Sequence, residues 1–169
     1  MSIADIESFA RSSGIYDFMN TKWGWPFIES LHYLALAMLL GTVGLFDLRL
    51  LGFARGISIG ALHRFVPLGV VAYINNIITG SMFFVSAPDQ YAYNPSFQLK
   101  LVCMAIAGLN VIVFYSTTAK SVKALAPSDA APLHAKIIAV VSLASWIGVI
   151  IFGRLITYFR PPYYWCFWC

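Results

Sequence analysis

Four long apolar stretches, interrupted by very few charged residues, occupy most of this chain. A transmembrane helix needs about 20 mostly apolar residues to cross about 30 Å of hydrocarbon, and each stretch reaches that length. The links between the stretches are short and contain Gly or Pro, which favours antiparallel neighbours in an up-down four-helix bundle. We therefore expect an all-α integral membrane protein that forms a single domain over residues 1–169. The expected spans cover about residues 26–51, 62–87, 97–118 and 136–159.

The segments before and after the spans have their own patterns. Within residues 1–25, Ile3, Ile6 and Phe9 recur at helical spacing with charged residues between them, which predicts a short amphipathic helix on the membrane surface. The same charges exclude a secretory signal peptide, whose core is apolar. Residues 160–169 are rich in aromatic side chains, which favours an interfacial belt or a contact with another subunit.

Composition supports a membrane protein and argues against a nucleic-acid partner. The chain is 60% hydrophobic and 11% charged, whereas ordinary globular domains are about 25% charged. A net charge of +4 would suit nucleic acid, but no long run of Lys and Arg is present. Basic residues at the ends of membrane helices instead set the orientation of the chain.

The basic residues favour one orientation. An even number of spans returns the C-terminal end to the side of the N-terminus, so the two links 52–61 and 119–135 share the opposite side. Short basic links face the cytoplasm, which predicts a bacterial inner-membrane protein with both termini in the periplasm. The basic residues on the predicted cytoplasmic side are Arg49, Arg55, Arg64, Lys120, Lys123 and Lys136.

Ionisable residues inside the predicted spans are the main functional candidates, because charge at membrane depth is costly. Glu29 and His32 lie three residues apart in the first span and so share a helix face. Arg154 lies near the same side of the membrane in the fourth span. We expect a Glu29–Arg154 ion pair, whose role would be to fasten the bundle.

His32 is the leading ligand candidate, although a membrane histidine can simply hydrogen-bond to another helix. Neutral imidazole binds both haem iron and copper. Met82 and Met104 are expected at a similar depth in the second and third spans. A His/Met pair ligates haem b in electron carriers, and the same groups suit copper(I). Cys166 and Cys169 in the C-terminal segment could add thiol ligands for copper.

The other two histidines, His63 and His134, are expected together on the opposite side of the bundle. A bis-histidine haem site between them is geometrically allowed. Both lie beside a basic residue at the predicted interface, which favours solvated histidines instead.

Three functions compete at this point. The first is a haem-binding, electron-transferring membrane subunit, and the second is a copper-handling membrane protein. The third is a subunit without a cofactor that packs against a larger membrane complex or a second copy of the chain. No nucleophile–base pair and no phosphate-binding loop are evident in the sequence, so ordinary hydrolase or kinase chemistry is not expected.

Four motifs stand out along the chain: Trp25-Pro26-x-x-Glu29-x-x-His32, Asp47-Leu48-Arg49-Leu50-Leu51-Gly52, Asn94-Pro95-x-Phe97-x-x-Lys100 and Gly153-Arg154-Leu155-Ile156-x-Tyr158. Together they resemble a family of small bacterial integral membrane proteins of unknown function, which is similar to the copper-resistance protein D type of membrane domain. The resemblance runs from about residue 23 to residue 158 and implies a four-helix membrane fold. It favours the copper hypothesis but implies no settled reaction.

Overall fold

The computed structural model describes residues 3–53, 55–123, 125 and 129–159 of the chain. Within these ranges the regular secondary structure is helical and no strand occurs. Cys166 and Cys169 lie outside the described residues, so their predicted roles are not addressed by the fold.

Four long apolar helices dominate the fold, as the sequence predicts. They begin with α3 (Gly24–Leu51) and α5 (Val66–Ser86), and α5 is preceded by the short α4 (Ile59–His63). The third is α7 (Pro95–Val113), which continues through the π-helical turn η1 (Phe114–Thr118) into α8 (Ala119–Lys123). The fourth is α9 (Leu133–Leu155). All four stretches are long and apolar enough to cross a membrane, which is compatible with a membrane helical bundle.

Helix boundaries differ from the apolar limits because polar caps extend the helices. The side chain of Asn94 accepts hydrogen bonds from the backbone N–H groups of Ser96 and Phe97, at 3.0 and 3.4 Å, so α7 begins at Pro95 rather than Phe97. In the same way Ser58 accepts from the N–H of Ala61 at 3.2 Å and starts α4. The caps thus place the start of α7 two residues before the predicted third span, and the start of α4 three residues before the predicted second span.

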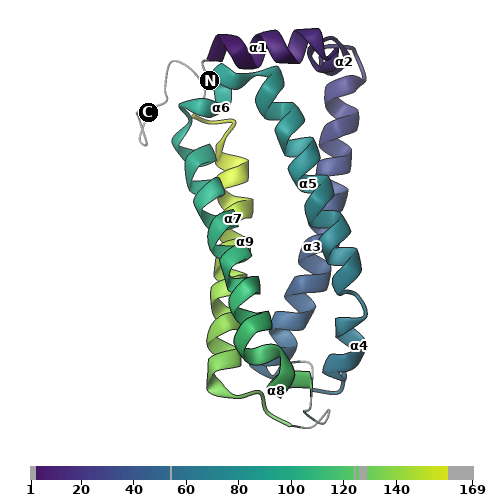
Figure 1. Ribbon diagram of the computed structural model, residues 1–169, viewed down its shortest axis with the longest axis vertical. Helices are drawn as coiled ribbons and strands as arrows, with labels where there is room; N and C mark the ends of the chain where they lie inside the picture. The colour runs from purple at the N-terminus through teal and green to yellow at the C-terminus, as the bar shows by residue number, and fades with distance from the viewer. Residues whose placement is uncertain (1–2, 54, 124, 126–128, 160–169) are drawn as a thin grey trace.

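The long helices form two packed pairs. α3 packs along α5 and α7 packs along α9, while α3 also contacts α9 (Figure 1). Among the described helices, no comparable packing joins α5 to α7. The α3–α5 pair and the α7–α9 pair therefore lie side by side with an open seam along one side.

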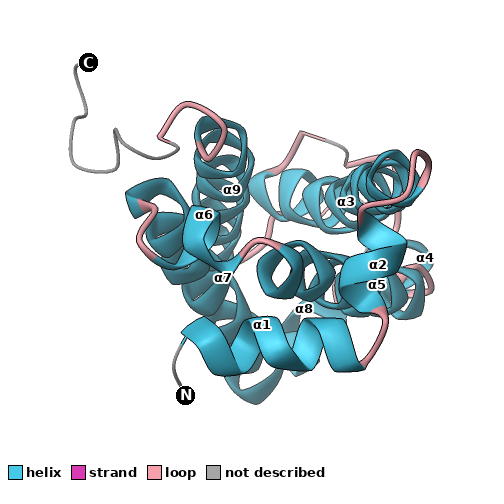
Figure 2. Ribbon diagram, turned by 90° about the horizontal axis from the view of Figure 1, so that it is seen from above, coloured by secondary structure: helices cyan, strands magenta, loops and turns pink. Residues whose placement is uncertain are grey.

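The two ends of the molecule are built differently. The end that carries α4 and α8, here the α8 end, holds a core cluster that draws Leu50 from α3, Phe114 from η1, Val122 from α8 and Ala135 from α9 (Figure 1). At the other end, here the α1 end, short helices lie over the long ones (Figure 2). These are α1 (Ile3–Ser12), α2 (Ile15–Met19) and α6 (Pro88–Ala92).

The predicted N-terminal helix is present as α1, although the N-terminal segment forms two helices rather than one. Ile6 and Ala10 of α1 are buried, while Phe9 is 56% exposed. Gly14 separates α1 from α2 with a left-handed φ of 72°, a conformation that glycine adopts without strain. Figure 2 shows α1 lying crosswise to the long helices, as a helix on a membrane surface would.

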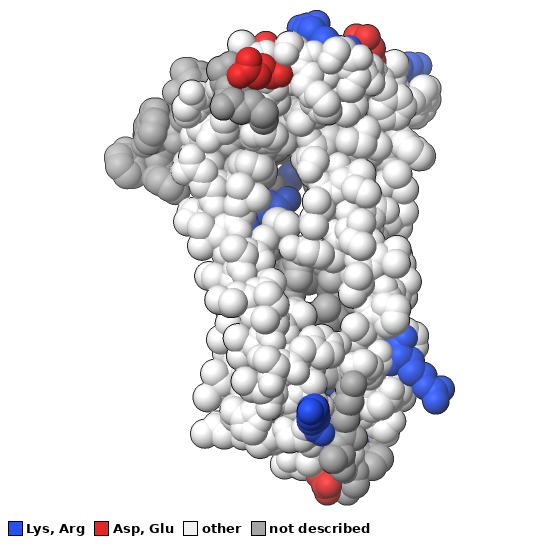
Figure 3. Space-filling view, viewed as in Figure 1, with Lys and Arg blue, Asp and Glu red and all other residues white. Residues whose placement is uncertain are grey.

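Charge is distributed as expected for four apolar helices with polar ends. In Figure 3 the basic and acidic atoms on the visible face gather toward the two ends, and the broad middle is almost uncharged. The exception is a hollow between the two helix pairs, in which basic atoms are visible.

Candidate functional site

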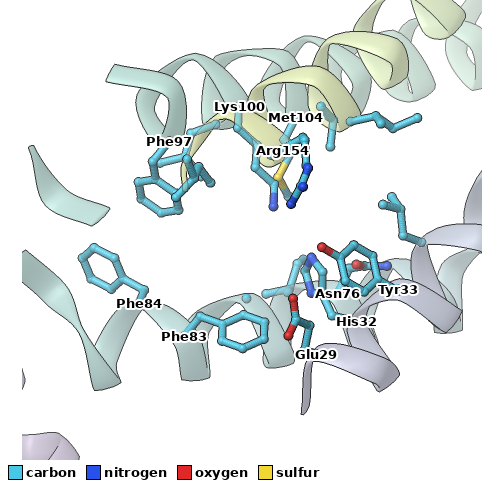
Figure 4. Close-up of a pocket in the computed structure, with 18 of the residues that line it drawn as sticks. Glu29, His32, Tyr33, Asn76, Phe83, Phe84, Phe97, Lys100, Met104 and Arg154 are labelled. Carbon is cyan, nitrogen blue, oxygen red and sulfur yellow. The ribbon is translucent and has the colours of Figure 1, made fainter. Parts of the chain in front are cut away.

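A cavity of about 590 Å³ lies between the two helix pairs, toward the α1 end. Ligand and cofactor pockets commonly occupy about 300–1,000 Å³ and have mostly apolar walls with a few polar groups. α3 and α5 form one wall of this cavity, and α7 and α9 form the other (Figure 4). The polar and charged side chains that line it include Glu29, His32, Asn76, Lys100 and Arg154.

Two aromatic contacts between the helix pairs lie at the edges of this cavity. Phe84 of α5 stacks on Phe97 of α7, with ring centroids 5.7 Å apart and planes at 10°. Tyr73 of α5 meets Trp146 of α9 edge-on at 6.2 Å. Tyr73 and Phe84 are eleven residues apart on α5, which corresponds to about 16 Å of helix. The cavity therefore has aromatic contacts on both the α1 side and the α8 side, with His32 and Lys100 among its lining residues.

The hydrogen bonds of His32 determine its tautomer. Its Nδ1 lies 2.7 Å from the Thr79 Oγ1, and that hydroxyl donates its single hydrogen to the Asn75 carbonyl, also at 2.7 Å. A carbonyl oxygen can only accept, so the hydroxyl must accept from the ring, and Nδ1 carries the imidazole proton. Nε2 is then left with a free lone pair. A metal-binding histidine has the same arrangement, in which a second hydrogen bond fixes the ring and its tautomer.

The ring of His32 packs against α5 beside Gly80. A Cβ atom at Gly80 would lie 3.6 Å from the Cε1 of His32. Phe83 meets the same ring edge-on at a centroid distance of 5.7 Å. Figure 4 shows the imidazole held against α5 and projecting into the cavity. The ring is thus oriented by packing as well as by its hydrogen bond to Thr79.

The opposite wall is basic. Figure 4 shows the Lys100 and Arg154 side chains reaching from α7 and α9 toward Glu29 and His32, with Met104 beside them. The stem of Lys100 packs against Gly153, since a Cβ there would lie 3.7 Å from Cδ and Nζ. Arg154 also lies over the Tyr158 ring, 5.8 Å from its centroid. Lys100 is half-buried, whereas Glu29 and Arg154 are exposed at the cavity mouth.

Glu29 and Arg154 therefore line one cavity, as their expected pairing requires. Within the described ranges no ion pair joins Glu29 to Arg154 or to Lys100 at the 4.0 Å limit. The ion pair stays a prediction.

The other candidate ligands lie in different places. Met104 lines the cavity, but Met82 packs in a separate cluster with Met19, Ile28 and Phe83 under α2. His63 lies at the α8 end, where its Nε2 is 3.3 Å from the Tyr115 hydroxyl. His134 is exposed at the start of α9. The structure thus brings His32 together with Met104 and separates both from the other two histidines and from Met82.

Two residues of the site were not among the candidates from sequence. Lys100 appears in the sequence analysis only within the motif Asn94-Pro95-x-Phe97-x-x-Lys100, and Thr79 is not predicted as a partner of His32. Lys100 lies five residues after Pro95, at a depth close to that of Glu29, which lies five residues after Gly24. This equal distance from the helix starts could have identified Lys100 as a neighbour of Glu29 from the sequence.

Other metal ligands are sparse. In the part of the chain that the structure describes, no group of three or more His, Cys, Asp or Glu side chains could hold a metal ion. Of the predicted copper ligands within the described ranges, only His32 and Met104 line the cavity.

No protein-family model, curated protein or solved structure matches this chain in the comparisons made. The resemblance to the copper-resistance protein D type of domain therefore stays a prediction. The function has to be argued from the cavity alone.

Proposed function

We propose that the protein is a multi-pass membrane protein that binds haem b between its two helix pairs and serves as an electron-transfer subunit. The main support for the proposal is the tautomer of His32, which leaves its Nε2 free to bind a metal. Its Nδ1 donates to Thr79, which leaves the Nε2 lone pair as the free donor of a ring that lines the 590 Å³ cavity. A neutral imidazole that is fixed in this way is a ligand for iron.

The rest of the cavity fits a haem group. Its walls are mainly aromatic and aliphatic, as a flat apolar macrocycle requires, and include Tyr73, Phe84, Phe97 and Trp146. Met104 supplies a thioether from the wall opposite His32, and a His/Met ligand set is one of those used for haem iron. Two basic side chains lie in the same cavity and are available to the carboxylates of haem.

Each residue has a definite task in this proposal. Haem supplies one-electron chemistry when it is bound. His32 would hold the iron through its Nε2 lone pair, Thr79 holds the ring in the required tautomer, and Met104 would be the second ligand, a type that raises the reduction potential. The apolar walls would surround much of the macrocycle, which also tunes the potential. An electron partner would be another membrane subunit or a second copy of the chain.

The proposed setting is the bacterial inner membrane. The four apolar helices would cross it in up-down order, with α1 lying on the surface and both ends of the chain in the periplasm. The basic residues of the α8 end, among them Arg64 and Lys120, would then face the cytoplasm. This orientation would put His32, eight residues into α3, nearer the periplasmic side.

A haem titration tests the proposal. Purified protein in detergent is titrated with Fe(III) protoporphyrin IX and followed by its visible absorption spectrum, before and after reduction. We expect one haem per chain in the wild type, and at least about 100-fold weaker binding in His32→Ala, because removing a ligand costs more than removing its hydrogen-bond partner.

The matched control is His134→Ala, which removes an exposed imidazole at the opposite end and is expected to bind like the wild type. Equal binding by His32→Ala and wild type would contradict the proposal. Stoichiometric copper with no haem spectrum would instead favour the copper hypothesis based on His32 and Met104.

A further inference from the structure

Two basic side chains reach into the cavity from the same wall, and metal ligation by His32 and Met104 does not by itself require either of them. Lys100 comes from α7 and Arg154 from α9, and Figure 4 shows their charged ends close together, facing His32 and Glu29. A charged group at membrane depth is costly unless it is paired or hydrated, so two neighbouring cations are a feature that needs an anion.

The described residues provide too little negative charge for the pair. Glu29 is the one acidic residue among those that line the cavity. With Lys100 and Arg154 charged and Glu29 ionised, the lining carries a net charge of +1. Neither cation lies within 4.0 Å of the Glu29 carboxylate in the described structure. The cavity is therefore suited to a ligand that brings its own carboxylates.

Local packing holds the cations in place. The stem of Lys100 lies along Gly153, since a Cβ there would be in van der Waals contact with Cδ, Cε and Nζ at 3.7–3.8 Å. Gly153 directly precedes Arg154 in α9, so one helix turn positions both basic groups. The guanidinium lies over Tyr158, which limits its motion.

We infer that Lys100 and Arg154 form a clamp for the two carboxylates of the bound ligand, which fixes the direction in which the macrocycle enters the cavity. This inference rests on the haem proposal and adds the requirement for a dianionic edge. Arg binds a carboxylate with two parallel hydrogen bonds, whereas Lys acts as a point charge. In this arrangement Lys100 and Arg154 of the α7–α9 wall would hold the carboxylates, and His32 of the α3–α5 wall would hold the metal.

The charge balance agrees with this orientation. The ferric form of the macrocycle with two ionised carboxylates has a net charge of −1, which equals the lining charge of +1 in magnitude. An ester of the same macrocycle lacks both anions and would leave Lys100 and Arg154 without counter-charges. Binding should therefore distinguish the acid from its ester even though both present the same apolar surface and the same metal.

The test compares Fe(III) protoporphyrin IX with its dimethyl ester in titrations of the detergent-solubilised full chain. We expect the wild type to bind the diacid at least about 10-fold more tightly than the ester, because charge-assisted hydrogen bonds are the strong ones. The double variant Lys100→Met and Arg154→Met should bind both forms with the affinity that the wild type has for the ester. The control variant Arg64→Met and Lys120→Met, which removes two exposed basic residues at the α8 end, should keep the wild-type preference.

Equal affinity of the wild type for acid and ester would overturn the clamp while leaving haem binding intact. The same conclusion would follow if the double variant kept the full preference for the acid. If neither form bound to the wild type, the haem proposal would fail and the clamp with it. The wild-type comparison needs no substitution, so it remains decisive even if the double variant does not fold.

Discussion

The α1 end and the α8 end of this molecule place their polar side chains in opposite environments. At the α8 end, Asp47 and Arg49 are 4% and 1% exposed and lie next to an apolar core. Arg49 donates from Nε to the Ile57 carbonyl at 2.8 Å. At the α1 end, Glu29 and Arg154 line an open cavity with His32 and Lys100.

This contrast separates a structural role from a binding role. Polar groups that fasten helices are enclosed and hydrogen-bonded within the protein, as Arg49 is through its Nε. Polar groups that serve a ligand are fixed in position but keep a free atom toward a cavity, as His32 keeps Nε2. The two ends should therefore respond differently to substitution, the α8 end in stability and the α1 end in ligand affinity.

The largest effect on stability is expected from Arg49→Met. The substitution removes a 1% exposed guanidinium, its hydrogen bond to Ile57 and its other interactions, which typically costs about 3–5 kcal/mol when the partners stay buried. Thermal unfolding in detergent, followed by circular dichroism, measures the loss. Arg64→Met, which removes an exposed guanidinium nearby, is the control. If Arg49→Met were as stable as the wild type, Arg49 would not stabilise the α8 end.

The second prediction concerns the α1 end and uses Thr79→Val. Valine keeps the shape of threonine but cannot accept the Nδ1 hydrogen bond of His32. Loss of such a partner typically weakens metal binding about 10- to 100-fold, while stability should change little. The haem titration described above measures the affinity, and Thr79→Ser is expected to restore it.

The control for this change is Thr42→Val. The Thr42 hydroxyl bonds only to carbonyls of its own helix, at Met38 and Leu39, and does not line the cavity. If Thr42→Val and Thr79→Val weakened haem binding equally, the Thr79 hydrogen bond would have no special role.

A smaller effect is expected from Gly148→Ala in the α7–α9 pair. A Cβ at this position would lie 2.7 Å from the Cys103 Sγ, so the Cys103 side chain or the two helices would have to shift. Overpacking of this kind costs about 1–3 kcal/mol. Adding Cys103→Ala should recover most of the loss, whereas Gly108→Ala, with nothing within 4 Å of its Cβ, should not destabilise the protein. Unchanged unfolding of Gly148→Ala would argue that α7 and α9 are not held closely together here.

The sequence was sufficient to predict the four long helices, because the length and hydropathy of each stretch determine them locally. It also placed Glu29, His32 and Arg154 at one end, since depth follows from counting residues along a helix. Which side of a helix faces which neighbour could not be obtained in that way. Met82 lies at a suitable depth on α5, yet it packs under α2 rather than in the cavity.

The open seam between α5 and α7 could not be predicted from the sequence pattern either. It exists because α5 packs on α3 and α7 on α9, without comparable packing between α5 and α7 in the described structure. Hydrophobicity alone does not specify that choice, since each of these helices is apolar over most of its circumference. Lys100 and Thr79 became site residues only through this arrangement.

The most direct test of the site uses His32→Gly together with free imidazole. If His32 supplies the iron ligand, this variant should lose the absorption spectrum of the haem-loaded wild type, and added imidazole should restore it by occupying the space left at residue 32. A wild-type spectrum in His32→Gly without imidazole would show that the iron ligand lies elsewhere and would contradict the assignment of the cavity.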